Sequence, residues 1–209
     1  MSDANPWLEI PLEDYERHMS HHLVGQSILL NSLTKKYLDE IKPETALFLG
    51  IAGGNGLEHI DTNRTRYVYG IDINQDYLDT AFKRYNHRIA SLQLLNLDIT
   101  KNPKTICRAD FIWAALVLEY TGIDEAFAFC ANNIRREGHL IISIQSNNNK
   151  PSVSSTGIES VKRAGEIFSI VDPEDLLRKA DEGGYKFIGS EENTLPNGKS
   201  IISFHVLSK

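Results

Sequence analysis

The sequence of 209 residues contains little cysteine, no long apolar run and no excess of basic residues. Its two cysteines, Cys107 and Cys130, are far apart and form no metal-spaced pair, so we expect reduced thiols in a reducing compartment. The longest apolar run, residues 111–118, is far too short to span a bilayer. Residues 1–6 show neither the basic nor the apolar segment of a signal peptide. These absences predict a cytoplasmic protein that makes no use of a membrane.

Acidic residues outnumber basic residues by 28 to 22, which gives a formal net charge of -6. A protein that grips a nucleic-acid backbone is expected to carry a basic surface, so we expect no nucleic-acid partner. Hydrophobic residues make up 41% of the chain, which is ordinary for a globular protein. The length is that of one domain with a sizeable core.

The stretch at residues 46–56, ALFLGIAGGNG, is the most informative part of the chain. Its apolar start predicts a buried strand, and the glycines behind it allow a sharp turn and the close approach of a ligand to backbone amides. The next strand-like run, residues 66–71, ends at Asp72. A glycine turn after one strand and a carboxylate at the tip of the next is the arrangement of a nucleotide site, where the acid binds ribose hydroxyls.

Strand and helix patterns alternate through the middle of the chain. Strand patterns cover 45–50, 66–72, 91–97, 109–115 and 138–145, and helix patterns between them cover 55–61, 74–87, 101–107 and 122–135. Such alternation predicts a doubly wound, Rossmann-like α/β sheet, mostly parallel, with helices on both faces. Asn74 is suited to cap one of these helices. Functional sites in such sheets lie at the carboxyl ends of the strands.

Both ends of the chain add to this pattern. Residues 13–41 carry apolar side chains at helical spacing, and Gly25 is a point at which this helix can divide. A polar loop is expected at 146–157, a short helix at 157–164, and a helix that begins with Asp172 and Pro173 and ends at residues 183–184. Strand patterns at 185–194 and 199–207 flank Pro-Asn-Gly, which predicts a terminal antiparallel hairpin and seven strands in all.

Five alternating units followed by a helix and an antiparallel hairpin resemble the class I S-adenosylmethionine-dependent methyltransferases. In that family the first strand and its turn usually read acidic-x-Gly-x-Gly-x-Gly. Residues 48–54 of this chain, FLGIAGG, keep Gly50 and Gly54, but Phe48 replaces the acid and Ala52 replaces the middle glycine. The resemblance implies S-adenosylmethionine as cofactor, S-adenosylhomocysteine as product, and a division into an N-terminal helical lid over 1–43 and a methyltransferase-like domain over 44–209.

The resemblance also assigns cofactor contacts. Asp72 matches the acid that binds the ribose, and Asp98 with Ile99 resembles the pair that holds the adenine. The full set of cofactor residues that it implies is Gly50, Ala52, Gly54, Asp72, Ile73, Asp98, Ile99 and Ala115. Because position 48 holds phenylalanine and no acid, Glu58 and Glu119 are candidates for the role of the missing carboxylate. Alanine at position 52 is unfavourable if the turn needs a positive φ there.

Methyl transfer from a sulfonium is an in-line displacement, so the enzyme mainly supplies position, and a general base helps when the acceptor has a proton to lose. Tyr15 and His18 lie on one helical face of the expected lid, and the pKa of histidine is ordinarily near neutrality. Glu119 and Tyr120, behind the fourth strand, are expected near the methyl group. Each of three also has a structural interpretation: His18 as a solvated histidine, Glu119 as an acid at a helix start and Tyr120 as a packing aromatic. His18 and His22 have metal-ligand spacing, but no third ligand is evident, so no metal is expected.

Three functions compete. The first is a methyltransferase acting on a small-molecule acceptor, since residues 114–117 do not resemble the Asn/Asp-Pro-Pro-Tyr of DNA-methylating relatives. The second is a nicotinamide oxidoreductase, which the glycine spacing and the final hairpin disfavour. The third is a methyltransferase-like domain that binds the cofactor or a partner without catalysis, suggested by the missing acid at Phe48. A homodimer formed through the lid is left open.

Overall fold

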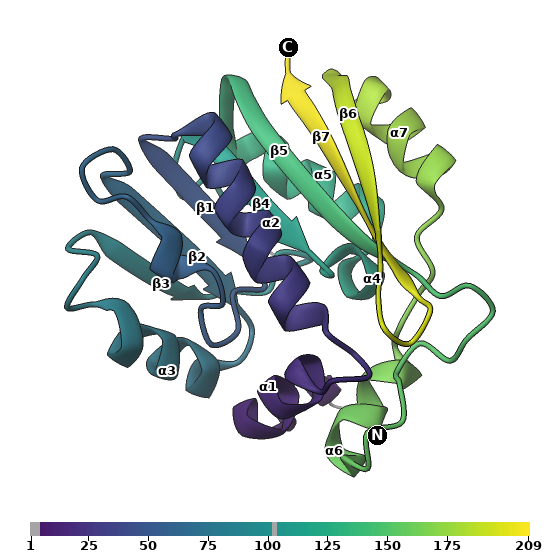
Figure 1. Cartoon of the computed structure of the whole chain (residues 1–209). Helices are drawn as coiled ribbons and strands as arrows, with labels where there is room; N and C mark the ends of the chain where they lie inside the picture. Colours follow the sequence, from purple (N-terminus) through teal and green to yellow (C-terminus); the bar gives the residue numbers. More distant parts are fainter. Residues whose placement is uncertain (1–4, 102–103) are drawn as a thin grey trace.

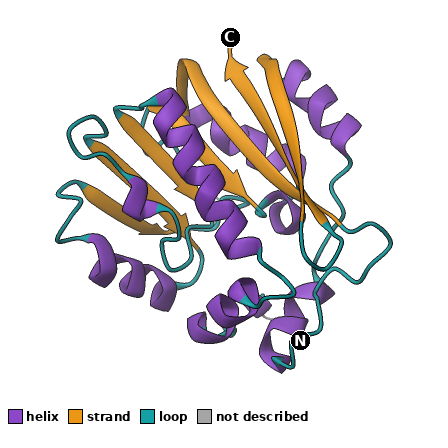
Figure 2. Ribbon diagram, in the orientation of Figure 1, coloured by secondary structure: helices purple, strands orange, loops and turns teal. Residues whose placement is uncertain are grey.

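The computed structural model describes residues 5–101 and 104–209. Its centre is a seven-stranded sheet with the order β3-β2-β1-β4-β5-β7-β6, in which β7 runs antiparallel to both of its neighbours (Figures 1 and 2). The strands are β1 (Thr45–Leu49), β2 (Tyr67–Asp72), β3 (Leu92–Asn96), β4 (Ala109–Ala115), β5 (Ile134–Ser146), β6 (Tyr185–Thr194) and β7 (Ser200–Ser208). The predicted mixed sheet with a terminal hairpin is confirmed.

Helices cover both faces of the sheet, as predicted (Figure 2). Alternate residues of a strand point to opposite faces, so Leu47 belongs to the core cluster that includes residues of α5 and α7, while Phe48 belongs to the one that includes residues of α2 and α3. The helical segments are η1 (Pro6–Leu8), α1 (Leu12–Ser20), α2 (Gln26–Ile41), η2 (Leu57–His59), α3 (Gln75–Tyr85), α4 (Leu118–Thr121), α5 (Ile123–Asn133), α6 (Glu159–Lys162), η3 (Arg163–Glu166) and α7 (Pro173–Glu182), where η marks a 3-10 helix.

The expected N-terminal helix divides at Gly25, which has a φ of 67°. The break allows α1 to leave the direction of α2 and to lie against α6, beside the carboxyl ends of the parallel strands (Figure 1). Side-chain contacts between described residues join these distant parts of the chain. The Ser160 hydroxyl donates to the Asp14 carboxylate over 2.5 Å, and Arg163 forms an ion pair with Glu9.

Two predicted helices differ from the structure. The helix expected at 55–61 is only the 3-10 turn η2, because Gly56 is left-handed and its amide donates to the Glu58 side chain. The helix expected at 101–107 includes residues 102–103, which lie outside the described residues, and residues 104–107 form no helix. Asn133 provides the reason, since its side chain binds the amides of Ile106 and Cys107 in place of helical partners.

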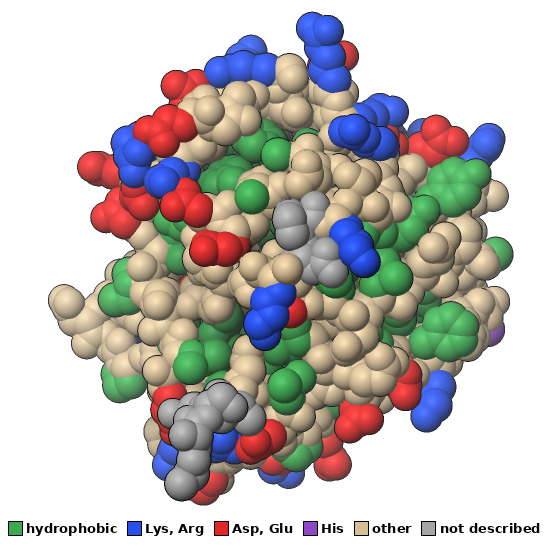
Figure 3. Space-filling model, turned by 180° about the vertical axis from the view of Figure 1, so that it is seen from behind, with side chains coloured by type: hydrophobic (Ala, Val, Ile, Leu, Met, Phe, Trp, Pro, Cys, Tyr) green, Lys and Arg blue, Asp and Glu red, His purple; other side chains and the backbone are tan. Residues whose placement is uncertain are grey.

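The caps and turns agree with the sequence patterns. The Asn74 side chain accepts hydrogen bonds from two amides of the first turn of α3, and Asp172 does the same for α7. Among the described residues, none of the helices combines the length and apolar character that a membrane crossing needs. On the rear face, acidic and basic side chains are interspersed, so charge of one sign does not gather there (Figure 3).

Candidate functional site

A cavity of about 170 Å³ lies at the carboxyl edge of the parallel strands, and we call it the first cavity. Four successive strand ends line it: Gly50 and Ala52 after β1, residues 71–73 at the tip of β2, residues 97–100 after β3 and residues 115–117 after β4. This is the place where ligands bind in doubly wound sheets. The structure therefore brings together most of the residues that the sequence singled out.

Asp72 is the best-fixed polar group of the first cavity. Its Oδ2 accepts a hydrogen bond from the amide of Ala52 and its Oδ1 accepts one from the amide of Asn74, each over 2.9 Å. Burial raises the pKa of this carboxyl, and the backbone hydrogen bonds act in the opposite direction. The carboxylate is held in one orientation at the cavity wall, with lone pairs left over for hydroxyl donors.

The backbone around the first cavity is strained at two non-glycine residues. Ala52 has a φ of 47° and Leu116 has a φ of 56°, both in the left-handed region that glycine favours. The turn therefore has the positive φ at which alanine is unfavourable. Such strain gathers at functional sites because the surrounding structure has to hold it in place.

Asp98 and Ile99 form another wall of the first cavity. Burial acts to raise the pKa of Asp98, but hydrogen bonds from Thr100 and the ammonium of Lys101 prevail and lower it. Ile99 is buried, and Ile73 lines the same cavity. An apolar slot next to a carboxylate can hold a flat ring that carries an amino group.

Four aromatic side chains cover the first cavity, and sequence reasoning found only Tyr15 and Tyr120 among them. Trp7 packs edge-on against both tyrosines, with ring centroids 5.7 Å from Tyr15 and 5.0 Å from Tyr120. Tyr77 stacks on Tyr15 at 6.1 Å. The side-chain amide of Asn74 donates to the carbonyl of Trp7 over 2.9 Å, which fastens η1 to the start of α3.

A second cavity, of about 280 Å³, lies on the other side of the glycine turn. It shares four lining residues with the first cavity, which are Tyr15, Gly50, Ala52 and Ala115. Phe48, at the position of the family acid, lines the second cavity and packs edge-on against Phe111 in the core. Glu16 and Arg84 also line it, and their side chains pair with each other.

Gly54 lines neither the first nor the second cavity, and its approach to the cofactor stays a prediction. A Cβ atom there would lie 2.7 Å from the ring of Tyr85, so this glycine allows the packing of α3 on the turn. Gly50 does line both cavities and has a φ of 62°.

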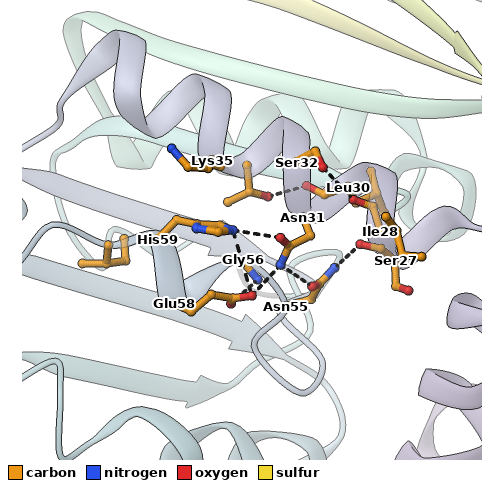
Figure 4. Close-up of polar contacts among 12 residues, drawn as sticks. Ser27, Ile28, Leu30, Asn31, Ser32, Lys35, Asn55, Gly56, Glu58 and His59 are labelled. Atoms are coloured by element: carbon orange, nitrogen blue, oxygen red, sulfur yellow. Dashed lines mark hydrogen bonds and ion pairs between the residues drawn. The ribbon is translucent and has the colours of Figure 1, made fainter.

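A polar cluster fixes the glycine turn to α2 (Figure 4). The side-chain amide of Asn31 donates to Glu58 over 2.6 Å and to Asn55 over 2.9 Å, and its oxygen pairs with a ring nitrogen of His59. Glu58 also accepts from the amide of Gly56 over 3.0 Å. Its carboxylate is thus committed to the turn and lines neither cavity, so Glu58 does not replace the acid missing at Phe48.

A third cavity, of about 60 Å³, borders the first and is lined by three of the predicted catalytic residues, Tyr15, His18 and Tyr120. His18 is buried, and its Nδ1 lies 2.7 Å from the hydroxyl of Thr156. Burial lowers the pKa of His18 to about 4, and the nearby charges of Lys199 and His21 act in the same direction. The imidazole is therefore neutral at pH 7.

Glu119, the fourth predicted catalytic residue, lies outside all three cavities. It is 1% exposed, and its Oε1 accepts a hydrogen bond from the amide of Gln145 over 2.7 Å. Its Oε2 is buried without a hydrogen-bond partner in the described structure, and burial raises the pKa of the carboxyl to about 7. His18 and His22 do not share a helical face, because α1 ends at Ser20.

Comparison with known proteins agrees with this geometry. Residues 47–142 match a family described as a methyltransferase domain. No curated protein matches the sequence at a significant level. Among solved structures, the N-methyltransferase NodS from Bradyrhizobium japonicum WM9, in complex with S-adenosylhomocysteine, superposes with a TM-score of 0.68 at 15% identity, covering 98% of this chain and 99% of its own.

Two further structures extend the comparison. Magnesium protoporphyrin IX methyltransferase from Synechocystis PCC 6803, with bound S-adenosylhomocysteine, gives a TM-score of 0.67 at 16% identity and covers 94% of each chain. The [4+2]-cyclase SpnF gives a TM-score of 0.65 at 12% identity, covering 85% of this chain and 81% of its own. Residues 47–142 thus match a methyltransferase domain family, and the chain has the class I S-adenosylmethionine-dependent methyltransferase fold.

Proposed function

We propose that the protein is an S-adenosylmethionine-dependent methyltransferase that acts on a small-molecule acceptor. The observation that carries this proposal is the Asp72 carboxylate, held by two backbone amides at the wall of a cavity that continues past Ala52 into a second one. Two similar structures, NodS and the magnesium protoporphyrin IX enzyme, were solved with S-adenosylhomocysteine and are methyltransferases by name.

The described residues fit this cofactor. Asp72 would accept from the ribose hydroxyls, and Asp98 with the apolar Ile73 and Ile99 would hold the adenine ring. The sulfur would lie where the two cavities meet, beside Gly50 and Ala115. When bound, the cofactor supplies a methyl group that its sulfonium has already activated for transfer.

The chain then has to position the acceptor and exclude water. The third cavity adjoins the first at Tyr15 and Tyr120, which makes it the natural place for the acceptor. The segments η1, α1 and α6 cover this cavity, and its volume of about 60 Å³ has room for only a small group. His18 lines this cavity and is neutral at pH 7, so its imidazole can accept a proton, although the burial that lowers its pKa makes it a weaker base than a free histidine.

A second candidate function is binding without methyl transfer. Phe48 and Ala52 depart from the family pattern, and Ala52 does so in strained backbone. The similarity to a structure named as a cyclase shows that proteins of this shape also carry out other reactions. In this alternative the first two cavities bind the cofactor, but no acceptor is methylated.

Thermal unfolding with S-adenosylmethionine, S-adenosylhomocysteine and NADH, each in large excess, tests the cofactor assignment. A ligand at a hundred times its dissociation constant adds about 2.7 kcal/mol, which is roughly 5–10 °C for a domain of this size. We expect the two sulfur compounds to raise the midpoint and NADH to leave it unchanged. A shift with NADH alone, or with none of the three, would overturn the proposal.

Formation of S-adenosylhomocysteine then separates catalysis from binding. Purified protein is incubated with labelled S-adenosylmethionine and a panel of small amines, alcohols, thiols and carboxylates. Transfer of label to at least one acceptor is expected. A protein that binds both sulfur compounds and transfers label to no member of a broad panel supports the binding function instead.

A further inference from the structure

The second cavity contains one carboxylate and one guanidinium, and they come from different elements. Glu16 lies on α1 and Arg84 lies near the end of α3, and among the described residues that line this cavity they are the only acid and the only permanent cation. The Arg84 Nη2 donates to the Glu16 Oε2 over 3.0 Å, and the Nη1 donates to the other oxygen. Phe48, in the wall of the same cavity, contributes no charge.

The pair lies directly on the glycine turn. The Arg84 Nη1 also donates to the carbonyl of Gly53 over 3.1 Å. A Cβ atom at position 53 would lie 2.6 Å from this nitrogen and would also collide with Glu16. The absence of a side chain at Gly53 therefore leaves the space in which the two charged groups meet the backbone of the turn.

The pairing between the two side chains is easily exchanged. The Arg84 side chain is 42% exposed and that of Glu16 is 39% exposed. Water and salt screen the attraction between charges with this much solvent contact. A ligand that offers each of them a partner of opposite charge can thus replace their mutual contact at small cost.

We propose that Glu16 and Arg84 bind the amino-acid end of S-adenosylmethionine, an inference that rests on the proposed function. The α-ammonium group donates to the Glu16 carboxylate, and the α-carboxylate accepts from the planar guanidinium of Arg84, which suits a two-oxygen partner. The two cavities meet at Tyr15, Gly50, Ala52 and Ala115, so one ligand can reach from Asp72 to this pair. The pair thereby binds the part of the cofactor that the family's acid binds, at the position where this chain has Phe48.

The proposal also links the cofactor to the lid. Glu16 is part of α1, whereas Arg84 is anchored on the sheet through α3. A zwitterion bound between them holds α1 against the glycine turn, next to Tyr15 at the junction of the cavities. A ligand without the amino-acid end cannot hold α1 against the glycine turn in this way.

Isothermal titration calorimetry with two ligands tests the assignment. S-adenosylhomocysteine has the amino-acid end, and 5′-methylthioadenosine has the same nucleoside and sulfur without it. We compare the unmodified protein with Glu16→Gln and Arg84→Met. The matched controls are Glu13→Gln, an exposed acid of α1, and Lys83→Met, an exposed base of α3.

A charged hydrogen bond of about 1.5–3 kcal/mol corresponds to roughly a 10- to 150-fold change in affinity. We expect each variant to lose this much affinity for S-adenosylhomocysteine and to bind 5′-methylthioadenosine within about twofold of the unmodified protein. Both controls should behave as the unmodified protein with either ligand.

Three results would overturn the inference. Unchanged affinity of both variants for S-adenosylhomocysteine would show that the pair does not touch the amino-acid end. An equal loss for both ligands would show that the pair only supports the turn. Equal affinities of the unmodified protein for 5′-methylthioadenosine and S-adenosylhomocysteine would show that the amino-acid end adds nothing to binding. If it binds neither ligand, the proposed function fails together with the inference.

Discussion

The carboxylate of Asp72 accepts a hydrogen bond from the amide of Ala52 over 2.9 Å, although Ala52 has a φ of 47°. The tip of β2 therefore holds the turn after β1 in a conformation that an alanine avoids. This hydrogen bond connects the glycine turn with Asp72, the two features of the sequence that indicate a nucleotide site. The side chain of Asp72 thus helps to hold Ala52 in its strained left-handed conformation.

Replacing Ala52 with glycine should stabilise the protein. The left-handed conformation costs an L-residue about 1–2 kcal/mol, and the greater freedom of glycine in the unfolded chain offsets about 0.5–1 kcal/mol of the gain. We expect the Ala52→Gly variant to be more stable by up to about 1 kcal/mol in urea unfolding. The control is Ala128→Gly, at an exposed position within α5, which should lower stability by about 0.5–1 kcal/mol. Destabilisation by both variants would contradict the strain at position 52.

Removing the carboxylate of Asp72 should weaken cofactor binding. Hydrogen bonds to a charged group contribute about 1.5–3 kcal/mol, so Asp72→Ala is expected to lower the affinity for S-adenosylhomocysteine by roughly 10- to 150-fold. Circular dichroism confirms that the variant is folded, and calorimetry gives the affinity. Asp61→Ala, at an exposed acid outside the three cavities, serves as the comparison. Equal affinities for Asp72→Ala and the unmodified protein would refute the ribose assignment.

Glu119 should make stability depend on pH. Burial raises the pKa of its carboxyl from 4.5 to about 7. The folded protein thus holds this proton more tightly than the unfolded chain, and its stability falls as the pH rises from about 4.5 through about 7. At about 1.4 kcal/mol per pKa unit, the full effect is roughly 3 kcal/mol. In Glu119→Gln, urea unfolding between pH 5 and pH 8 should lack this component, whereas the same slope in both proteins would contradict it.

His18 should act in the opposite direction. Its folded pKa of about 4 lies below the usual 6.5, because burial and then Lys199 and His21 disfavour the charged ring. Protonation therefore favours the unfolded chain, and stability is lost as the pH falls from about 6.5 toward 4. The His18→Gln variant should lose less stability between pH 7 and pH 5 than the unmodified protein. The exposed His87→Gln provides the comparison, and an identical acid response of all three proteins would argue against a buried neutral His18.

Much of the fold follows from local patterns. The alternation of strands and helices, the cap at Asn74, the helix start at Asp172 and the hairpin turn at residues 196–198 each depend on a few neighbouring residues. Local chemistry decides these features, so a single sequence is sufficient to predict them. The position of Asp72 can be predicted in the same way, because Asp72 lies at the end of a strand.

What sequence patterns missed depends on residues far apart in the chain. Asn133 binds the backbone of residues 104–107 and removes the need for a helix there. Tyr77 on α3 stacks on Tyr15 of α1 over the first cavity, and these two residues come from distant parts of the sequence. Arg84 is one of two neighbouring basic residues in the last turn of α3. Nothing in its local sequence shows that it reaches Glu16 on a different element.

The cover over the cavities is built from both halves of the chain, with η1 and α1 meeting α6 and η3. The contacts of Asp14 with Ser160 and of Glu9 with Arg163 lie on this seam. A molecule that passes through this seam has to break both contacts and the apolar packing between them. The opening frequency of the seam then limits the rates of association and release along this route. Substitutions along the seam should alter residence times even where they leave equilibrium affinities unchanged.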